Sequence, residues 1–397
     1  MFDALFTTTT EYKKLSHALS GKGACALFGL PASGRAQVYA ALCRQLDKPL
    51  CIVTPGEAEA TRFAADLNTL GIPAAVFPAR DYVLRPIEGT AREYEYRRLA
   101  VLGELVGGRL RAVAVPAEAL TQFTTPKEDF CANTRTLHAG DTLLRDDLLA
   151  ALFGAGYTRR AQVDGPGQFS VRGDIVDIFA PDQKMPVRME FWGDEIDTLH
   201  TFDLTTQRRE DAIDKFYLSP AREVLFGKPA DAAEQLRAFL AKQRGKKKTA
   251  MADCMAADLD LLDGGAVPVN MDKYLAVRYP HPATVLDYFD DPILVAEEPA
   301  SIREADRATA YRGGEELKSL ILDGVLCAGL DNLYADPSYL WSKTGHYRTI
   351  CAENFARSMP DQPLKDIINA PAHTLPAWNG EVAGLLEDLK PLCDAGY

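Results

Sequence analysis

The sequence predicts an α/β protein whose parallel sheet is interrupted by an antiparallel α+β domain. From residue 10 to about residue 125, short apolar segments alternate with segments of helical periodicity, which is typical of strands buried on both faces of a parallel sheet. From about residue 130 to residue 215, apolar and polar residues instead alternate singly, as in an antiparallel sheet with one solvated face. Two kinds of sheet are therefore expected.

The first α/β segment, residues 1–130, contains strands and helices in strict alternation. Each predicted strand is a short apolar run, and each predicted helix places apolar residues three and four positions apart. The predicted strands are 24–30, 48–54, 74–78 and 111–116, and the predicted helices are 34–46, 57–71 and 90–108.

The inserted α+β domain is expected at residues 131–215. Its clearest elements are 168–181 and 186–203, which the short link 182–185 joins in a hairpin-like arrangement. The α/β pattern resumes at 216–330 and includes a helix, a turn and a strand within 284–299.

The last part of the chain is predicted to be helical and polar between 301 and 348, with a break at Gly313–Gly314. A strand from residue 349 and a helix near the end predict a small α/β domain at 349–397, and we expect the natural chain to continue beyond Tyr397.

Composition indicates a folded protein that has no membrane span. The chain is 47% hydrophobic and 25% charged, and no apolar run reaches the roughly 20 residues that cross a bilayer. The first residues lack the pattern of a secretory signal, so we expect a cytoplasmic protein and, by default, a monomer. The 8 cysteines and 6 histidines are scattered without the spacing of metal ligands. We therefore expect no metal and no other cofactor, and we expect no disulfide.

The net charge of −12 argues against a protein whose main task is to hold a phosphate backbone. The dense basic run at 242–248 is interpreted as a solvated loop, with weak DNA binding as the alternative.

The loop "GLPASGRA" at 29–36 resembles a phosphate-binding P-loop that has lost its chemistry. It keeps the strand–loop–helix order, but a working loop needs a Lys for the terminal phosphates and a hydroxyl for magnesium. Arg35 and Ala36 stand at those positions, and Glu297 and Glu298 follow a later strand without the Asp that would order magnesium. Hydrolysis is therefore not expected. The degenerate loop comprises Gly29, Ser33, Gly34, Arg35 and Ala36.

The stretches "GQFSVRGDIVDIFAPD" and "PVRMEFWGDEIDTLHTFDLTTQR" span 167–208. They resemble the damage-binding and UvrA-interacting domain that UvrB shares with the bacterial transcription-repair coupling factors. The flanking stretches 77–82, 97–105 and 284–299 are similar to the split helicase-like domain of the same proteins. The resemblance implies a degenerate P-loop, helicase-like domain that is split by the inserted domain.

Two departures from UvrB favour the coupling factors. UvrB carries a working ATPase site and a long aromatic hairpin, whereas here the P-loop is degraded and only a short segment, 82–97, occupies the place of the hairpin. The resemblance implies a non-catalytic module that binds UvrA. It also implies a longer parent, an ATP-dependent DNA translocase that contacts RNA polymerase and DNA through further domains. A UvrB-like, ATP-dependent damage-verification protein is the alternative.

The resemblance assigns contacts with UvrA to Arg172, Arg188 and Trp192. Strand alternation independently places Arg188, Glu190 and Trp192 on one face, with Met189 on the core side. An exposed Trp flanked by Arg is typical of an interface hot spot. The alternatives are a Trp covered by a neighbouring loop and, for Arg172, a salt bridge to Asp174 or Asp194, with a bulge at Gly173.

Overall fold

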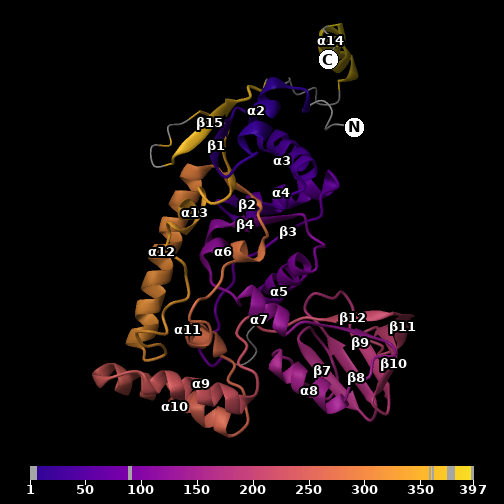
Figure 1. The fold of residues 1–397 in the computed structure, drawn as a ribbon, viewed down its shortest axis with the longest axis vertical. Coiled ribbons are helices and arrows are strands. Elements are labelled where there is room, and N and C mark those ends of the chain that lie inside the picture. The colour runs from indigo at the N-terminus through magenta and orange to yellow at the C-terminus, as the bar shows by residue number, and fades with distance from the viewer. Residues whose placement is uncertain (1–6, 88–91, 357–358, 360–361, 373–380, 395–397) are drawn as a thin grey trace.

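Three structured regions make up the chain. The computed structural model describes residues 7–87, 92–356, 359, 362–372 and 381–394. Figure 1 shows a helix-covered parallel sheet in the upper part, a second sheet at the lower right and a group of helices at the lower left.

The first sheet is entirely parallel and has seven strands in the order β15-β1-β14-β13-β2-β4-β3. Five of its strands are buried runs, as a parallel sheet between helices requires, whereas the edge strand β3 is half-buried and the edge strand β15 is largely exposed. The predicted α/β class is confirmed. The strands are β1 (Gly23–Phe28), β2 (Leu50–Thr54), β3 (Ala74–Val76), β4 (Ala112–Pro116), β13 (Ile293–Glu297), β14 (Arg348–Glu353) and β15 (Leu364–Asn369).

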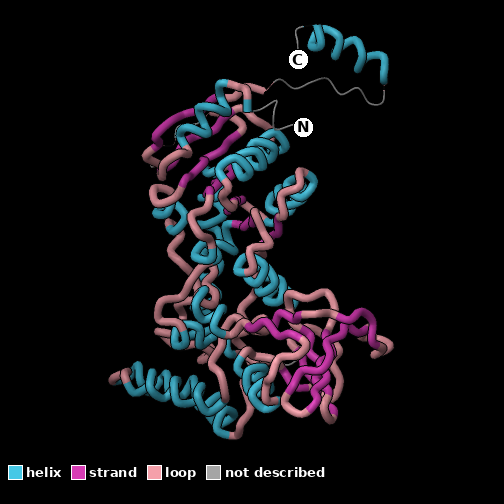
Figure 2. The backbone as a smooth tube through the Cα atoms, turned by 45° about the vertical axis from the view of Figure 1, so that its right-hand side comes forward, coloured by secondary structure: helices cyan, strands magenta, loops and turns pink. Residues whose placement is uncertain are grey.

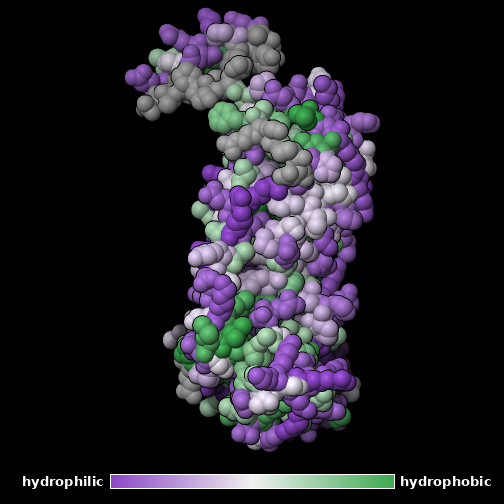
Figure 3. All heavy atoms as spheres, turned by 90° about the vertical axis from the view of Figure 1, so that its left-hand side faces the viewer, coloured by the Kyte–Doolittle hydropathy of each residue, from purple (hydrophilic) through white to green (hydrophobic). Residues whose placement is uncertain are grey.

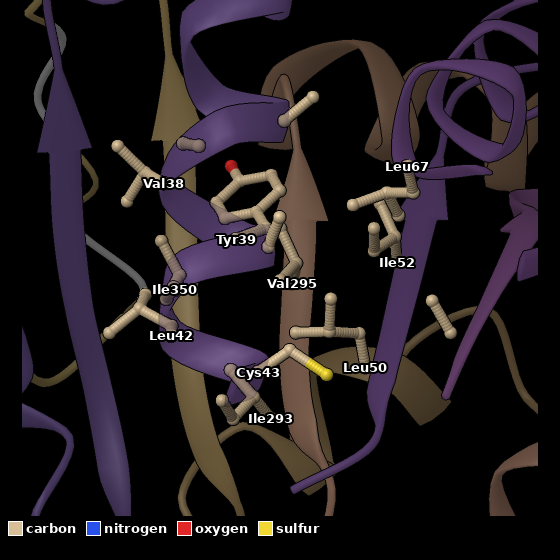
Figure 4. Packing of buried hydrophobic residues seen from close by; sticks show 14 of the residues in the cluster. Val38, Tyr39, Leu42, Cys43, Leu50, Ile52, Leu67, Ile293, Val295 and Ile350 are labelled. Atoms are coloured by element: carbon tan, nitrogen blue, oxygen red, sulfur yellow. The ribbon is translucent and has the colours of Figure 1, made fainter. Parts of the chain in front are cut away.

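Helices cover both faces of this sheet with separate apolar cores. One face packs against α2 (Thr10–Ala18), α3 (Ala32–Leu46) and α4 (Glu57–Thr69). Figure 4 shows the contact, in which Tyr39 and Leu42 of α3 lie over the strand residues. The opposite core takes residues from α5 (Glu93–Val106), α6 (Ala117–Thr121), α7 (Lys127–Ala132), η2 (Val285–Tyr288), α12 (Pro299–Leu322) and α13 (Tyr339–Lys343).

The C-terminal strands differ from expectation. The strand that was expected to open a separate small domain is β14, which lies at the centre of the first sheet between β1 and β13, and β15 extends the edge. Ile350 and Cys351 are fully buried, as a central parallel strand requires, but a short apolar run does not reveal which sheet it joins. Only α14 (Val382–Asp394) stands apart from the body, as Figure 2 shows.

The break expected at Gly313–Gly314 is also absent, because α12 continues through both glycines for 24 residues. The strong helix formers Glu315, Glu316 and Leu317 follow directly, and they outweigh a cost of about 1 kcal/mol for each glycine.

The second sheet carries the inserted domain. Its six strands run in the order β11-β10-β9-β8-β7-β6, antiparallel except for the pair β6 and β7. Helix α8 (Arg145–Gly154) and a two-stranded sheet of β5 (Arg135–His138) and β12 (Lys215–Leu218) share its core. The strands are β6 (Thr158–Arg159), β7 (Gln168–Arg172), β8 (Ile175–Phe179), β9 (Val187–Trp192), β10 (Glu195–Phe202) and β11 (Arg209–Ala212).

Between this sheet and β13 the chain is helical rather than alternating α/β. A third apolar core joins α9 (Pro229–Ala241), α10 (Gly245–Asp263), η1 (Met271–Tyr274), α11 (Leu275–Arg278) and the end of α12. The resumed α/β segment expected at 216–330 thus returns to the first sheet through a single strand, β13.

Buried charges join the three regions. Arg98 of α5 donates its Nε to the Glu223 carboxylate at 2.6 Å, and both side chains are fully buried. Arg80 holds Asp272 at 2.7 Å and lies 3.3 Å from Glu223. The Glu95 carboxylate accepts the backbone N–H of Glu223 at 3.0 Å. Burial alone would raise the pKa of Glu95, but Arg80 and its neighbouring arginines hold it at about 2. The first sheet, the exit from the inserted domain and the helical region thus share one charge network.

The surface of the molecule is largely hydrophilic on the side shown in Figure 3, with a hydrophobic group low in that view. Within the described ranges, we find no helix that is both long and apolar enough to span a membrane.

A substitution at Gly314 tests the continuity of α12, and one at Gly29, in the loop after β1, provides the contrast. Gly314→Ala places a methyl group in open space within the helix and should raise the free energy of unfolding by about 0.5–1 kcal/mol. Gly29→Ala should lower it by at least about 1 kcal/mol, because φ is +92° and the new Cβ would lie 2.7 Å from the Ala370 carbonyl oxygen. Urea unfolding measures both, and a destabilising Gly314→Ala would contradict a continuous helix.

Candidate functional site

The outer face of the second sheet carries the predicted contact residues. On β9, Met189 and Phe191 are buried in the core, whereas Arg188, Glu190 and Trp192 point to the other face. The register places Asp177 of β8 opposite Arg188, and it places Ile175 opposite both Glu190 and Arg172. The predicted alternation is therefore present, and the sheet brings Arg172 to the same face as the other three.

Two tight turns place Arg172 and Trp192 at the same end of the sheet. Arg172 pairs with Ile175 across Gly173–Asp174, and Trp192 pairs with Glu195 across Gly193–Asp194. Each Gly has φ near +60° and is the first central residue of a two-residue turn, the position where a type II′ turn needs a glycine. The bulge expected at Gly173 is thus a hairpin turn.

A buried carboxylate organises the arginines. Asp177 is 1% exposed and accepts from Arg188 Nε at 2.7 Å, from Arg188 Nη2 at 3.0 Å and from Arg172 Nη2 at 2.8 Å. Two guanidinium groups, from the strands on either side of β8, therefore share one anion, an arrangement that fixes the position of each side chain.

The arginines differ sharply in exposure. The Arg188 side chain is only 10% exposed, because it lies 4.7 Å from the Phe202 ring and donates to the Gln207 carbonyl oxygen at 3.2 Å. The Arg172 side chain is 50% exposed. Trp192, at 82%, is among the most exposed large apolar residues of the described chain. The accessible part of the candidate surface is thus the pair Arg172 and Trp192, which we call the hairpin edge.

Glu190 lies beside the hairpin edge and has partners of its own. Its carboxylate accepts from Thr198 Oγ1 at 3.1 Å and forms an ion pair with Arg209. It therefore contributes a neutralised polar border and not a free negative charge.

Reasoning from the sequence did not find Asp177. Arg172 pairs with this residue rather than with Asp174 or Asp194, and Asp174 instead lies 3.5 Å from Arg145. Alternation along "DIVDIF" places Asp177 on the polar face, so the sequence could predict this face. Its two arginine partners could not be predicted, because they depend on the register between three strands.

The degenerate P-loop forms a second polar cluster at the carboxyl end of the first sheet. Arg35, in the first turns of α3, lies 2.9 Å from Glu297 and 2.9 Å from Glu298. Tyr39 donates its hydroxyl to Glu297. The loop arginine is thus neutralised by Glu297, the last residue of β13, and by Glu298, which follows it.

The surroundings of this loop do not fit a magnesium nucleotide. Ala36 is fully buried in the core and offers no hydroxyl, and the backbone of Ala370 packs against Gly29 where phosphate would approach. The adjoining cavity of about 440 Å³ is lined by charges of both signs, with Arg35 and Arg62 facing Glu59 and Glu298. Ser33 and Gly34 lie in the first turn of α3, whose start has no side-chain cap. The predicted 82–97 segment lies partly outside the described residues, since 88–91 are not described.

A cavity of about 1140 Å³ lies elsewhere, and none of the predicted site residues lines it. It separates α8 and the loop before β7 from the start of α9. Across the described ranges, no three His, Cys, Asp or Glu side chains converge as metal ligands would.

Comparison with known proteins places the hairpin edge within a family. Residues 136–224 match the family described as the UvrB interaction domain. The transcription-repair-coupling factor of Bacillus subtilis (strain 168) is 27% identical over 378 residues, which is 92% of this chain and 32% of that protein. The Myxococcus xanthus factor is 35% identical over 208 residues, 50% of this chain and 17% of that protein.

The chain is thus similar to transcription-repair-coupling factors over most of its length. It spans about a third of the length of the Bacillus relative. The UvrABC system protein B of Chlorobium limicola is also similar, at 25% identity over 327 residues, 75% of this chain and 48% of that protein. Arg172, Asp177, Arg188, Glu190 and Trp192 all lie inside the matched UvrB interaction domain.

The free energy of unfolding should depend more strongly on Arg188 than on Arg172. Arg188→Ala should lower the free energy of unfolding by roughly 2–4 kcal/mol, because it leaves the buried Asp177 with one half-exposed partner. Arg172→Ala should cost no more than about 1 kcal/mol, because Arg188 still compensates the carboxylate. Denaturant unfolding tests this order, and equal losses would contradict it.

The pH dependence of stability tests the P-loop cluster. Burial raises the pKa of Glu297 from its ordinary 4.5 to about 7, even though Arg35 and Tyr39 favour the carboxylate. The Glu297 carboxyl group thus holds its proton more tightly in the folded chain than in the unfolded chain. The resulting contribution to the free energy of unfolding is complete below about pH 4.5 and is lost as the pH rises through 7.

The advantage of the wild type over Glu297→Gln in free energy of unfolding should therefore shrink between pH 5 and pH 8. The exposed Glu316→Gln serves as control and should show a constant difference. Urea unfolding at both pH values provides the measurement, and a constant difference for Glu297→Gln would refute the raised pKa.

Proposed function

We propose that this chain is a non-catalytic recruitment module that binds UvrA through the hairpin edge of its UvrB interaction domain. In a longer protein it would link the removal of stalled RNA polymerase to nucleotide excision repair. Further parts of that protein, beyond the chain described here, would contact RNA polymerase and would also contact DNA.

The observation that carries this proposal is the exposed Trp192 at the same end of the sheet, and on the same face, as the half-exposed Arg172. A Trp that is 82% exposed is costly to leave in water, and the pairing of aromatic and Arg side chains is characteristic of binding hot spots. Asp177 holds the Arg172 guanidinium in place before binding, which lowers the entropy that binding must remove. The match to the UvrB interaction domain and the names of the relatives point to UvrA and to repair.

Arg188 takes a supporting role in this proposal. Its guanidinium is largely covered: it donates hydrogen bonds to Asp177 and to the Gln207 carbonyl oxygen and lies over the Phe202 ring. It therefore positions Asp177 and, through Asp177, Arg172. Glu190 lies at the border of the surface, where its pairing with Arg209 limits repulsion of an acidic partner.

The non-catalytic part of the proposal is supported by the internal neutralisation of Arg35. A phosphate would have to displace Glu297 and Glu298 from the guanidinium, and no hydroxyl at position 36 would hold magnesium.

The similarity to UvrABC system protein B favours a second candidate, an ATP-dependent protein that verifies DNA damage. This function requires magnesium–ATP at the Arg35 cluster. Calorimetric titration with magnesium–ATP distinguishes the candidates: absence of binding at millimolar nucleotide supports the recruitment module, and micromolar affinity supports the UvrB-like protein.

Substitutions at the hairpin edge should weaken UvrA binding without unfolding the chain. Trp192→Ala and Arg172→Ala should each cost about 1–3 kcal/mol of binding free energy, measured by calorimetry with purified UvrA. Both side chains project from the sheet surface, so thermal unfolding should change little.

The matched control removes an exposed aromatic and an exposed arginine elsewhere, as Tyr311→Ala with Arg307→Ala on α12. Wild-type affinity in the Arg172 and Trp192 double variant, with the fold intact, would remove the hairpin edge from the proposal.

A further inference from the structure

The end of the α9–α10 helical hairpin concentrates positive charge. The connection between the helices and the first turn of α10 carry cations that are all exposed. This end projects at the lower left of Figure 1, and Figure 3 looks onto it near the bottom of a mainly hydrophilic surface. The cations are Lys242, Arg244, Lys246, Lys247 and Lys248. We call them the basic tip.

The basic tip forms no ion pair with the carboxylates of the described residues. In the described part of the chain, no ion pair joins any of its five side chains to a carboxylate, whereas Arg237, further along α9, pairs with Asp263. This concentration of positive charge occurs in a chain whose net charge is −12.

Helix energetics do not explain the lysines. The N-terminus of a helix carries partial positive charge and favours acidic residues, each by roughly 0.3–1 kcal/mol. The first turn of α10 contains no acidic residue and holds Lys246, Lys247 and Lys248 instead, and its N-cap Arg244 provides no side-chain cap. Side chains and helix end therefore both favour a negatively charged ligand at the same place.

We propose that the basic tip binds the phosphate backbone of duplex DNA. Its chemistry is that of backbone contact: four of the five cations are lysines, which act as mobile point charges toward phosphates. None of the residues 242–248 is aromatic, so the tip lacks the anchors that an interface with an acidic protein would use.

The position of the tip allows simultaneous binding of a protein partner. In both ribbon views the α9–α10 hairpin and the second sheet project to opposite sides of the molecule. The tip is thus independent of the hairpin edge, and the proposal does not rest on UvrA binding.

Fluorescence anisotropy of the whole chain with a labelled duplex of about 20 base pairs tests the proposal. Five phosphate contacts predict a slope of log affinity against log salt of about −4.5, which is a loss of roughly 500-fold between 50 and 200 mM salt. The variant Lys246→Glu, Lys247→Glu, Lys248→Glu should bind at least ten times more weakly, with a slope shallower by about 3.

The triple variant should still fold, because glutamates in the first turn stabilise helix α10. A charge-matched control, Lys13→Glu, Lys14→Glu, Lys22→Glu, changes exposed lysines in and after α2. It should retain most of the affinity.

Equal losses in both variants would overturn the proposal, since they would indicate a general charge effect. Absence of binding at 50 mM salt would also overturn it. Tighter binding of polyglutamate than of the duplex would overturn it in favour of an acidic protein partner, and tighter binding of duplex RNA would overturn the choice of DNA.

Discussion

The buried charge network around Glu223 is the interaction on which the arrangement of the molecule depends. Arg98 and Arg80 come from the first sheet and its helices, Glu223 from the chain leaving the inserted domain, and Asp272 from the helical region. These groups are almost fully removed from water, so the loss of one partner would leave an uncompensated charge at the meeting point of all three parts. These ion pairs therefore tie the exit from the inserted domain to the other two regions.

The candidate binding surface uses the same device on a smaller scale. Asp177 is buried in the polar face of a sheet and holds two guanidinium groups, one covered and one accessible. The covered Arg188 stabilises the anion. The accessible Arg172 shares one end of the sheet with Trp192, because the two glycine turns lie at that end. At the Arg35 cluster, by contrast, Glu297 and Glu298 neutralise the guanidinium that would otherwise be free to bind a nucleotide phosphate.

Local patterns predicted much of this structure. The alternation in 24–116 identified each strand and helix there, because fully apolar runs and helical periodicity are local properties. Alternation also placed Arg188, Glu190 and Trp192 on one face. The position of β14 inside the first sheet and the helical character of 219–288 were missed, because strand order and the packing of helices depend on distant contacts. The continuous α12 was missed because the helix formers that follow Gly313–Gly314 outweigh the cost of the two glycines. Asp177 was missed for the same reason: its role requires the register of β7, β8 and β9 together.

The most direct test of the recruitment account is hydrogen exchange of the whole chain, measured by mass spectrometry with and without UvrA. Binding through the hairpin edge predicts slower exchange in peptides that cover the two turns, residues 172–175 and 192–195, with unchanged exchange at α3 and at residues 242–248. Protection confined to the Arg35 cluster or the helical region, with the two turns exchanging as in the free chain, would contradict the account.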